Sequence, residues 1–196
     1  MTSPRNESKS ELRRVLRANR PGMEAQISQS GEIRSHLRDW LASHPARVIA
    51  AFSSIPGEAM LLPLIADFPD RQWVLPRIEG EALIFHFVTA EELPGIASGS
   101  FGIGEPAANS PVCPTEQINL FLCPGMAFTK CGKRLGRGKG FYDRALSAAD
   151  SESERVGVCF REQVIPELPI EVHDLPMHFL ATPDGVTPTN QAALPP

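Results

Sequence analysis

Short apolar runs typical of buried strands alternate along this chain with segments typical of helices. The runs are ARVIAAFSS (46–54), RQWVLPRI (71–78), ALIFHFV (82–88), INLFLCPG (118–125), RVGVCF (155–160) and HFLAT (178–182). Near-continuous apolar runs are typical of strands that are covered on both faces, as in parallel sheets. The alternation therefore predicts an α/β fold, with a mainly parallel, Rossmann-like sheet and helices on both of its faces.

Two helices are predicted before the first strand. Ser8 and Glu11 have the spacing of a capping box, and Pro21 marks an end, so we expect a helix over residues 8–20. Beside its narrow apolar stripe runs a row of cations: Lys9, Arg13, Arg17 and Arg20. These cations are expected at the rim of the surface on which the helix packs. A second helix is expected around residues 33–41.

Two further helices are expected, at residues 61–65 and from about residue 138 to residue 149. The segment 90–114 is rich in Gly, Pro and Ser and is expected to be irregular. With 196 residues, and with neither an internal repeat nor a clear linker, the chain is expected to form a single domain over residues 1–196. The few apolar residues of the first helix favour a mobile segment.

Charge and composition limit the classes of function. The formal net charge is −4, which argues against binding of polyanions by bulk electrostatics. No apolar run approaches the ~20 residues of a membrane-spanning helix, and the N-terminus lacks the apolar centre of a signal peptide. The four cysteines show no CxxC spacing, so reduced thiols in a cytoplasmic protein are the simplest interpretation. We expect a monomer with neither a nucleic-acid nor a membrane partner.

One stretch, GMAFTKCGKRLGRGKGFYDRAL (125–146), differs from the rest and is called the basic glycine-rich segment below. Its cations are Lys130, Lys133, Arg134, Arg137, Lys139 and Arg144, interspersed with Gly132, Gly136, Gly138 and Gly140. It follows a predicted strand, and open α/β sheets bind ligands at the carboxyl ends of their strands. It leads into a predicted helix, whose N-terminus favours phosphate oxygens. A phosphate-bearing ligand is therefore predicted, most economically a nucleotide, and Asp143 would suit a magnesium ion shared with its phosphates.

Two familiar nucleotide-binding motifs do not fit. Aligned on Lys139, a P-loop would need glycine where the chain has Lys133, and serine or threonine where it has Gly140. The dinucleotide fingerprint fails as well, because the glycines read G-x-G-x-G. Two other interpretations stay open at this point: a solvated, mobile loop, and an RNA-binding module that uses the basic run.

At full length, PGMAFTKCGKRLGRGKGFYDR resembles the signature of the 5-formyltetrahydrofolate cyclo-ligase (methenyltetrahydrofolate synthetase) family. That signature reads P-G-x-A-F-D-x-x-G-x-R-L-G-x-G-x-G-[FY]-Y-D. Other family blocks follow in order: KSELR (9–13), SSIPGE (53–58), VLPRI (74–78), GIGEP (102–106) and LPIEVHDLPM (168–177). The resemblance thus covers most of the chain.

The resemblance implies a reaction. ATP would phosphorylate the formyl oxygen of 5-formyltetrahydrofolate, the neighbouring folate nitrogen would close the ring, and phosphate would leave, giving 5,10-methenyltetrahydrofolate and ADP. Both nucleophiles belong to the substrate, so the protein needs neither a nucleophilic serine nor a nucleophilic cysteine. A relative that binds nucleotide without catalysing this reaction is the alternative.

The resemblance also implies roles for individual residues. ATP would be bound by Lys9, Arg13, Arg134, Leu135, Gly136, Arg137, Gly138, Lys139, Gly140, Phe141 and Tyr142. The folate would be bound by Ser53, Glu58, Arg137, Gly138, Lys139, Gly140 and Phe141. Arg137 and Lys139 would stabilise the transferring charge as catalytic residues, and Asp143 and Asp174 would hold Mg²⁺.

Without the resemblance, several of these residues have simpler interpretations. Lys9 and Arg13 could form a solvated cationic helix face, Glu58 could stabilise a helix N-terminus, and Asp174 could form a turn. The chain also departs from the signature once, with Thr129 where the family usually has Asp. Threonine keeps a hydrogen-bonding side chain but loses the charge, so a salt bridge or cation site at this position is not expected.

Overall fold

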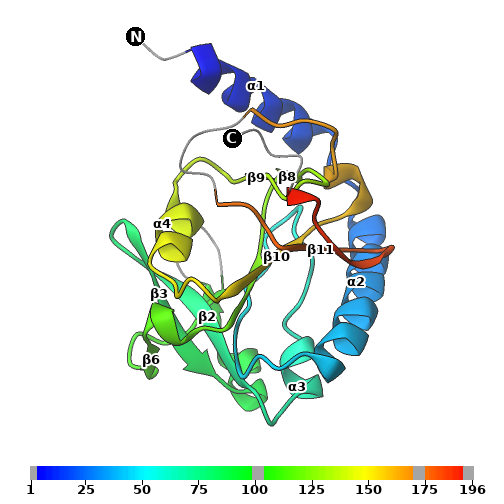
Figure 1. Ribbon diagram of the computed structural model, residues 1–196. Helices are drawn as coiled ribbons and strands as arrows, with labels where there is room; N and C mark the ends of the chain where they lie inside the picture. Colours follow the sequence, from blue (N-terminus) through cyan, green and yellow to red (C-terminus); the bar gives the residue numbers. More distant parts are fainter. Residues whose placement is uncertain (1–3, 99–103, 170–174, 192–196) are drawn as a thin grey trace.

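The computed structural model describes residues 4–98, 104–169 and 175–191. Its main sheet contains β1 (Val48–Ala50), β2 (Gln72–Glu79), β3 (Ala82–Val88), β6 (Val112–Cys113), β7 (Leu120–Cys123), β10 (Glu154–Val158), β11 (Phe179–Thr182) and β12 (Gly185–Pro188). The strand order is β12-β11-β10-β7-β1-β2-β3-β6 (Figure 1). The predicted strands are all present, and the short edge strands β6 and β12 are additions.

The five central strands run parallel, as predicted. β1 pairs in parallel with β2 and with β7, and β10 pairs in parallel with β7 and with β11. The antiparallel pairs of the main sheet are β2–β3, β3–β6 and β11–β12. The β2–β3 hairpin pairs Glu79 with Ala82 across a tight turn, and Gly80 at its start has φ +59°. A turn of this kind requires positive φ, which glycine adopts without strain.

Helices cover both faces of the sheet, as predicted. The helices are α1 (Pro4–Ala18), α2 (Met23–Ser43), α3 (Leu64–Asp67) and α4 (Phe141–Ser147). α2 and α3 bury Ile33, Leu37 and Leu64 in an apolar cluster on one face. α4 buries Ala145 and Leu146 in a second cluster on the other face. Figure 1 shows α2 and α4 on opposite sides of the sheet, with α1 beyond one end of its strands.

Short elements fill the connections. They are the 3₁₀ helices η1 (Ala90–Gly95), η3 (Thr115–Gln117) and η4 (Arg161–Gln163) and the two-residue strands β4 (Ala97–Ser98), β5 (Gly104–Glu105), β8 (Ala127–Phe128) and β9 (Arg134–Leu135). The segment 90–114 is therefore less irregular than predicted. The β8–β9 hairpin was not predicted, because two-residue strands leave almost no periodic signal.

The predicted helix boundaries were wrong in four places. α1 begins at Pro4, so position 8 lies inside the helix and not at its N-cap, and Glu11 pairs with Arg14 at 2.6 Å. α2 begins at Met23, ten residues before the predicted segment 33–41. α3 begins at Leu64 and not at residue 61. α4 begins at Phe141 and not near residue 138, because Gly138 and Gly140 have φ of +98° and +68°, outside the helical region.

In the described part of the chain, no helix combines the length and the apolar character needed to cross a membrane. The single-domain organisation remains a prediction. It is supported by the main sheet, which draws its strands from Val48 to Pro188 into one layer.

Candidate active site

A cavity of about 690 Å³ opens at the carboxyl ends of the central strands. From β1 the chain adds β2 on one side, and it later adds β7 and β10 on the other side. Such a switch point leaves a crevice between the two connections, and open α/β sheets bind ligands there. Residues that follow β1 and β7 line the cavity, together with α1, parts of β2, β3 and β5, and residues 134–143.

The loops after β1 and β7 owe their shape to two glycines. Gly57 has φ +95° and lies in the turn that Glu58 closes by donating its backbone N–H to the Ile55 carbonyl at 2.9 Å. Gly125 follows β7, and a Cβ there would lie 2.6 Å from the ring of Phe128. Both positions therefore favour glycine, the first for its backbone conformation and the second for space.

The basic glycine-rich segment passes beneath α1. The Arg13 Nε donates a hydrogen bond to the Gly136 carbonyl at 2.9 Å, and a Cβ at Gly138 would lie 3.3 Å from the Arg13 guanidinium. Leu12 and Leu16 of α1 pack against the apolar cluster of Met126, Ala127, Leu135 and Leu168. This packing turns the cationic side of α1 toward the cavity.

The structure thereby brings three of the four cations of the predicted row to the cavity, and the fourth, Arg20, lies beyond the end of α1. Lys9, Arg13 and Arg17 line the cavity, and Lys9 is only 5% exposed. The cavity wall therefore concentrates positive charge beside the exposed Arg137 and Lys139 of the glycine-rich segment.

An ion pair between the buried Glu58 and the more exposed Arg137 joins the β1 loop to the glycine-rich segment. The Arg137 Nε donates to Glu58 Oε1 at 2.9 Å, and the Ile55 backbone N–H donates to Glu58 Oε2 at 3.3 Å. Glu58 is 8% exposed. Burial raises the pKa of the Glu58 carboxyl above its ordinary value, and the Arg137 charge and these hydrogen bonds only partly oppose that rise.

A second ion pair fixes the start of α4. The Arg134 guanidinium donates to Asp143 Oδ1 at 2.5 Å and to the Pro124 carbonyl at 3.2 Å. It also lies 5.5 Å from the centre of the Tyr142 ring. The Arg134 side chain is 5% exposed, whereas that of Asp143 is 40% exposed. Arg134 therefore holds Asp143 and Tyr142 in place, and the Asp143 carboxylate remains accessible from the cavity.

Two hydroxyl groups in the cavity lining lack protein partners. Within the described residues, Ser53 Oγ and Tyr142 Oη are buried and make no hydrogen bond. Burial raises the pKa of the Tyr142 phenol well above its ordinary value, so this hydroxyl stays protonated and can donate. Buried polar groups without partners are costly, and both are placed to bind a polar ligand.

Sequence comparison identifies the family. The chain matches the model of the 5-formyltetrahydrofolate cyclo-ligase family over residues 5–183. The chain belongs to this family. The resemblance noted in the sequence is thus confirmed, and with it the assignment to an enzyme family of the cyclo-ligase class.

Individual relatives agree with this assignment. The 5-formyltetrahydrofolate cyclo-ligase of Mycolicibacterium smegmatis is 33% identical over 192 residues, covering 92% of this chain and 95% of the relative. That of Escherichia coli is 28% identical over 187 residues, covering 89% and 98%. The solved structure of Aquifex aeolicus 5,10-methenyltetrahydrofolate synthetase superposes with a TM-score of 0.80 at 31% identity, covering 93% of both chains. The synthetase of Mycoplasma pneumoniae, at 19% identity and a TM-score of 0.70, supports the fold alone.

One carboxylate of the cavity lining was not predicted from the sequence of this cyclo-ligase family member. Glu105 on β5 is 3% exposed and lines the cavity. Its Oε1 accepts from the Ile78 backbone N–H at 3.2 Å, and its Oε2 lies 3.4 Å from Arg77. Its position in the GIGEP block was the available signal, but a block match by itself does not reveal which side chain points into a cavity.

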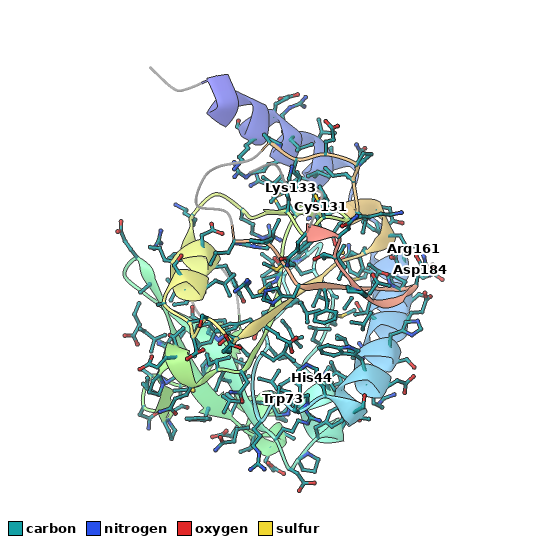
Figure 2. The ribbon with its side chains drawn as sticks, in the orientation of Figure 1. His44, Trp73, Cys131, Lys133, Arg161 and Asp184 are labelled. Carbon is teal, nitrogen blue, oxygen red and sulfur yellow. The ribbon has the colours of Figure 1, made fainter. Side chains whose placement is uncertain are left out.

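Not all residues of the glycine-rich segment reach the cavity equally. The Leu135 side chain is 2% exposed and packs in the apolar cluster under α1, so it shapes the wall without offering a polar contact. Lys133 and Cys131 lie in the β8–β9 turn (Figure 2), and Lys133 is outside the set of described residues that line the cavity. Arg144 instead donates to the Glu81 and Lys139 carbonyls.

The described residues suit a magnesium ion that takes a carboxylate from the protein and most of its other ligands from water and substrate phosphates. Asp174, the second predicted metal ligand, lies outside the described residues. Among the described residues, no group of three or more His, Cys, Asp or Glu could hold a metal ion. Mg²⁺ commonly takes one or two carboxylates, several waters and substrate phosphates. The accessible Asp143 carboxylate, on the same cavity wall as the cations, suits that arrangement.

Thr129, which stands where the family signature usually has Asp, has a structural role in the β8–β9 turn. This residue is 1% exposed, and its Oγ1 accepts the Lys133 backbone N–H at 3.2 Å, closing the β8–β9 turn. An aspartate carboxylate can accept the same hydrogen bond, as aspartate commonly does in turns. Position 129 therefore shapes the hairpin that carries the glycine-rich segment.

We expect Thr129→Asp to keep turnover within about threefold of the parent, because the turn hydrogen bond is retained. The matched change Thr129→Val keeps the shape but leaves the Lys133 N–H without its acceptor. It should lower Tm by roughly 3–6 °C, the effect of losing about one buried hydrogen bond. Steady-state kinetics and thermal melts of both variants test this; a collapse of turnover in Thr129→Asp would contradict it.

Proposed function

We propose that this protein catalyses the ATP- and Mg²⁺-dependent cyclisation of 5-formyltetrahydrofolate to 5,10-methenyltetrahydrofolate, with release of ADP and phosphate. One observation carries the proposal beyond family membership. A single cavity joins a cationic wall, formed by α1 and the glycine-rich segment, to the buried Glu58 carboxylate. The first part suits a triphosphate, and the second suits a heterocycle that donates hydrogen bonds.

The triphosphate half is built from side-chain charge and accessible backbone. Lys9 and Arg13 reach the cavity from α1, and residues 136–140 form its facing wall. Arg and Lys form short, charge-assisted hydrogen bonds with phosphate oxygens, and glycines allow close backbone approach. ATP would therefore lie between α1 and the glycine-rich segment, as the family resemblance implies for these residues.

The folate half combines apolar walls with a few polar groups. Phe52, Pro76, Ile78 and Leu83 line this region, a composition that suits a flat heteroaromatic ring. Glu58 would accept hydrogen bonds from the pterin amino and ring N–H groups. Ser53, whose buried Oγ belongs to the same cavity lining, would supply a further hydrogen bond.

The reaction needs the formyl oxygen in line with the γ-phosphorus. A bond from this oxygen to phosphorus forms as the bond from phosphorus to ADP breaks. The neighbouring folate nitrogen then attacks the formyl carbon and loses its proton, and the carbon–oxygen bond breaks with release of phosphate, which takes up that proton. Arg137 and Lys139 would stabilise charge on the transferring phosphoryl group. The Arg137 Nε also donates to Glu58 Oε1 at 2.9 Å, so Arg137 links the phosphate half of the cavity to the folate half.

Asp143 would hold Mg²⁺, with Asp174 as its second carboxylate by the resemblance. The ion would neutralise phosphate charge when bound. Arg134 fixes the Asp143 carboxylate through one oxygen, which leaves the other available. The preorganised carboxylate thus needs little rearrangement.

The test is to mix purified protein with ATP, Mg²⁺ and 5-formyltetrahydrofolate and to follow methenyltetrahydrofolate by its near-ultraviolet absorbance. Growth of absorbance that requires all three components would support the proposal. No growth, from folded protein that still binds ATP, would overturn it and favour a non-catalytic nucleotide-binding relative.

Asp143→Asn should raise the Mg²⁺ concentration at half-maximal rate by about tenfold, because the amide is a weaker ligand for a hard cation. A magnesium titration of turnover at fixed ATP measures this. Asp39→Asn, an exposed change on α2, serves as the control and should leave the titration unchanged. An unchanged titration for Asp143→Asn would remove Asp143 from the metal site.

A further inference from the structure

Two glutamine side chains hold the peptide groups on either side of Gly57, the residue before Glu58. The Gly57 N–H donates to Gln26 Oε1 at 3.0 Å, and Gln163 Nε2 donates to the Gly57 carbonyl at 3.0 Å. Gln26 comes from α2 and Gln163 from η4, so the loop is held between two elements that are distant in sequence. Glycine adopts the φ of +95° at Gly57 without strain, so these two hydrogen bonds select this conformation among those open to glycine.

Gln163 also contacts the loop after β7, on the other side of the switch point. Its Nε2 donates a second hydrogen bond, to the Gly125 carbonyl at 3.2 Å. Gly125 follows β7 and lines the cavity, whereas Gly57 belongs to the loop after β1. One amide group therefore ties together the two loops that form the crevice.

A hydrogen bond outside the two loops sets the orientation of the Gln163 amide. Its Oε1 accepts the Phe160 backbone N–H at 2.8 Å, at the start of η4. With the oxygen committed there, the NH₂ group has to face the two loop carbonyls. Each of its two hydrogens then has one acceptor.

Gln26 extends this support toward α1. Its Nε2 donates to the Pro21 carbonyl at 2.7 Å, in the junction between α1 and α2, and the residue is 6% exposed. The same side chain thus contacts the end of the segment that carries Lys9 and Arg13, as well as the turn that carries Glu58. Its two hydrogen bonds fix the position of one relative to the other.

We propose that Gln163, supported by Gln26, is a positioning residue for the folate substrate. It holds the Glu58 turn against the Gly125 loop, so that the Glu58 carboxylate keeps its place in the cavity. Neither glutamine belongs to the cavity lining of the described residues, so both act through Glu58 and Gly125. This inference rests on the proposed function.

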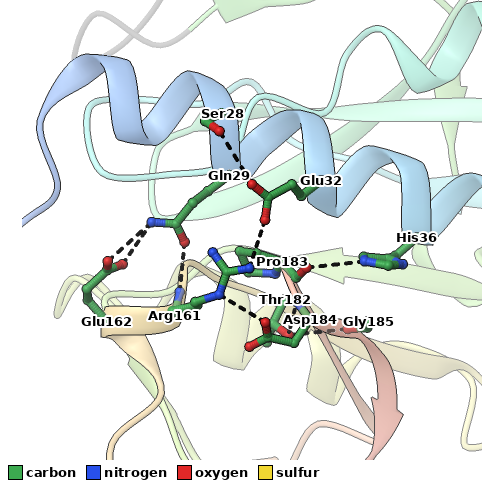
Figure 3. A network of polar contacts seen from close by, with 10 residues as sticks. All are labelled: Ser28, Gln29, Glu32, His36, Arg161, Glu162, Thr182, Pro183, Asp184 and Gly185. Carbon is green, nitrogen blue, oxygen red and sulfur yellow. Dashed lines mark hydrogen bonds and ion pairs between the residues drawn. The ribbon is translucent and has the colours of Figure 1, made fainter.

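A neighbouring glutamine provides a matched comparison. Gln29 also joins α2 to η4: its Oε1 accepts the Arg161 N–H at 3.0 Å, and its Nε2 donates to Glu162 at 3.0 Å (Figure 3). Figure 3 shows these contacts within the polar network between α2 and the β11–β12 turn. Gln29 therefore resembles Gln163 in chemistry and in the elements it links, but its hydrogen bonds go to η4 and not to either loop.

The experiment compares Gln163→Glu with Gln29→Glu. Gln163→Glu keeps an acceptor for the Phe160 N–H but turns an oxygen toward the Gly57 and Gly125 carbonyls. The KM for 5-formyltetrahydrofolate should rise about tenfold, with the KM for ATP within about twofold of the parent. Calorimetric binding of 5-formyltetrahydrofolate without ATP should weaken by a similar factor. Gln29→Glu should lower Tm at least as much, yet leave both KM values within about twofold.

If Gln163→Glu does not fold, Gln26→Met is a second variant that removes support from the Gly57 peptide group. It keeps the side-chain length but removes the acceptor of the Gly57 N–H, so it should also raise the folate KM. Because it also removes the donor to the Pro21 carbonyl beside α1, only the folate KM is compared for this variant. Lowered Tm with unchanged folate KM, or equal losses in Gln163→Glu and Gln29→Glu, would overturn the inference. Parent turnover in the same assay tests the proposed function separately; if the folded parent neither turns over nor binds 5-formyltetrahydrofolate, both proposals fail.

Discussion

Replacing Lys139 with alanine should lower the turnover number by about 100- to 1,000-fold, the usual cost of removing one preorganised group that stabilises transition-state charge. Lys139 lies between Gly138 and Gly140, both with positive φ, on the cavity wall that faces α1. Lys139 thus lines the cavity from a loop, shortly before α4 begins at Phe141. The KM for 5-formyltetrahydrofolate should change little, because the ammonium group is assigned to the phosphoryl group.

Lys133→Ala is the matched control for this change. It removes the same charge from the same basic segment, but Lys133 lies in the β8–β9 turn, outside the cavity lining of the described residues (Figure 2). Turnover should stay within about twofold of the parent. Steady-state kinetics of both variants, with near-ultraviolet circular dichroism to verify folding, decide the matter. Activity of Lys139→Ala within a few-fold of the parent would show that the assigned role is wrong.

Glu58→Gln should move stability and activity in opposite directions. The buried Glu58 carboxyl has a raised pKa, so at neutral pH its ionisation in the folded protein opposes folding. A neutral amide of the same shape removes that cost, and Tm should rise by roughly 2–5 °C. Catalytic efficiency for 5-formyltetrahydrofolate should fall by about 100-fold, because the amide NH₂ would face pterin donors.

The pH dependence of this stability difference has a definite sign. A group whose pKa is raised on folding contributes most to stability below its unfolded pKa, and this contribution is lost as pH rises through the folded pKa. The advantage of Glu58→Gln should therefore be largest at neutral pH and should shrink on acidification, as Glu58 of the parent becomes protonated. Thermal melts over a pH series measure this.

Glu81→Gln, an exposed change in the β2–β3 turn, should alter neither Tm nor catalytic efficiency. A lower Tm for Glu58→Gln at neutral pH would mean that the ion pair with Arg137 outweighs the burial cost of the carboxylate. An unchanged catalytic efficiency would remove Glu58 from the folate site.

The architecture could be predicted from local sequence patterns. Apolar runs longer than a few residues identified the central strands, and their alternation with helices predicted a mainly parallel sheet, which β1, β2, β7, β10 and β11 form. The glycine-rich segment was placed correctly after β7, because a strand and the loop that follows it are neighbours in sequence as well as in space. Short strands such as β8 and β9 escaped prediction because they lack a measurable period.

The sequence by itself determined the chemistry available at the site: the cations of α1, the glycines, and the carboxylates Glu58 and Asp143. Only the tertiary structure decided their partners. It paired Arg137 with Glu58, turned Arg134 inward onto Asp143, buried Leu135 under α1 and brought Glu105 into the cavity. Periodicity and capping depend on neighbours within a few residues, whereas these pairings depend on the strand order of the sheet. That order is set by packing between segments that are far apart along the chain.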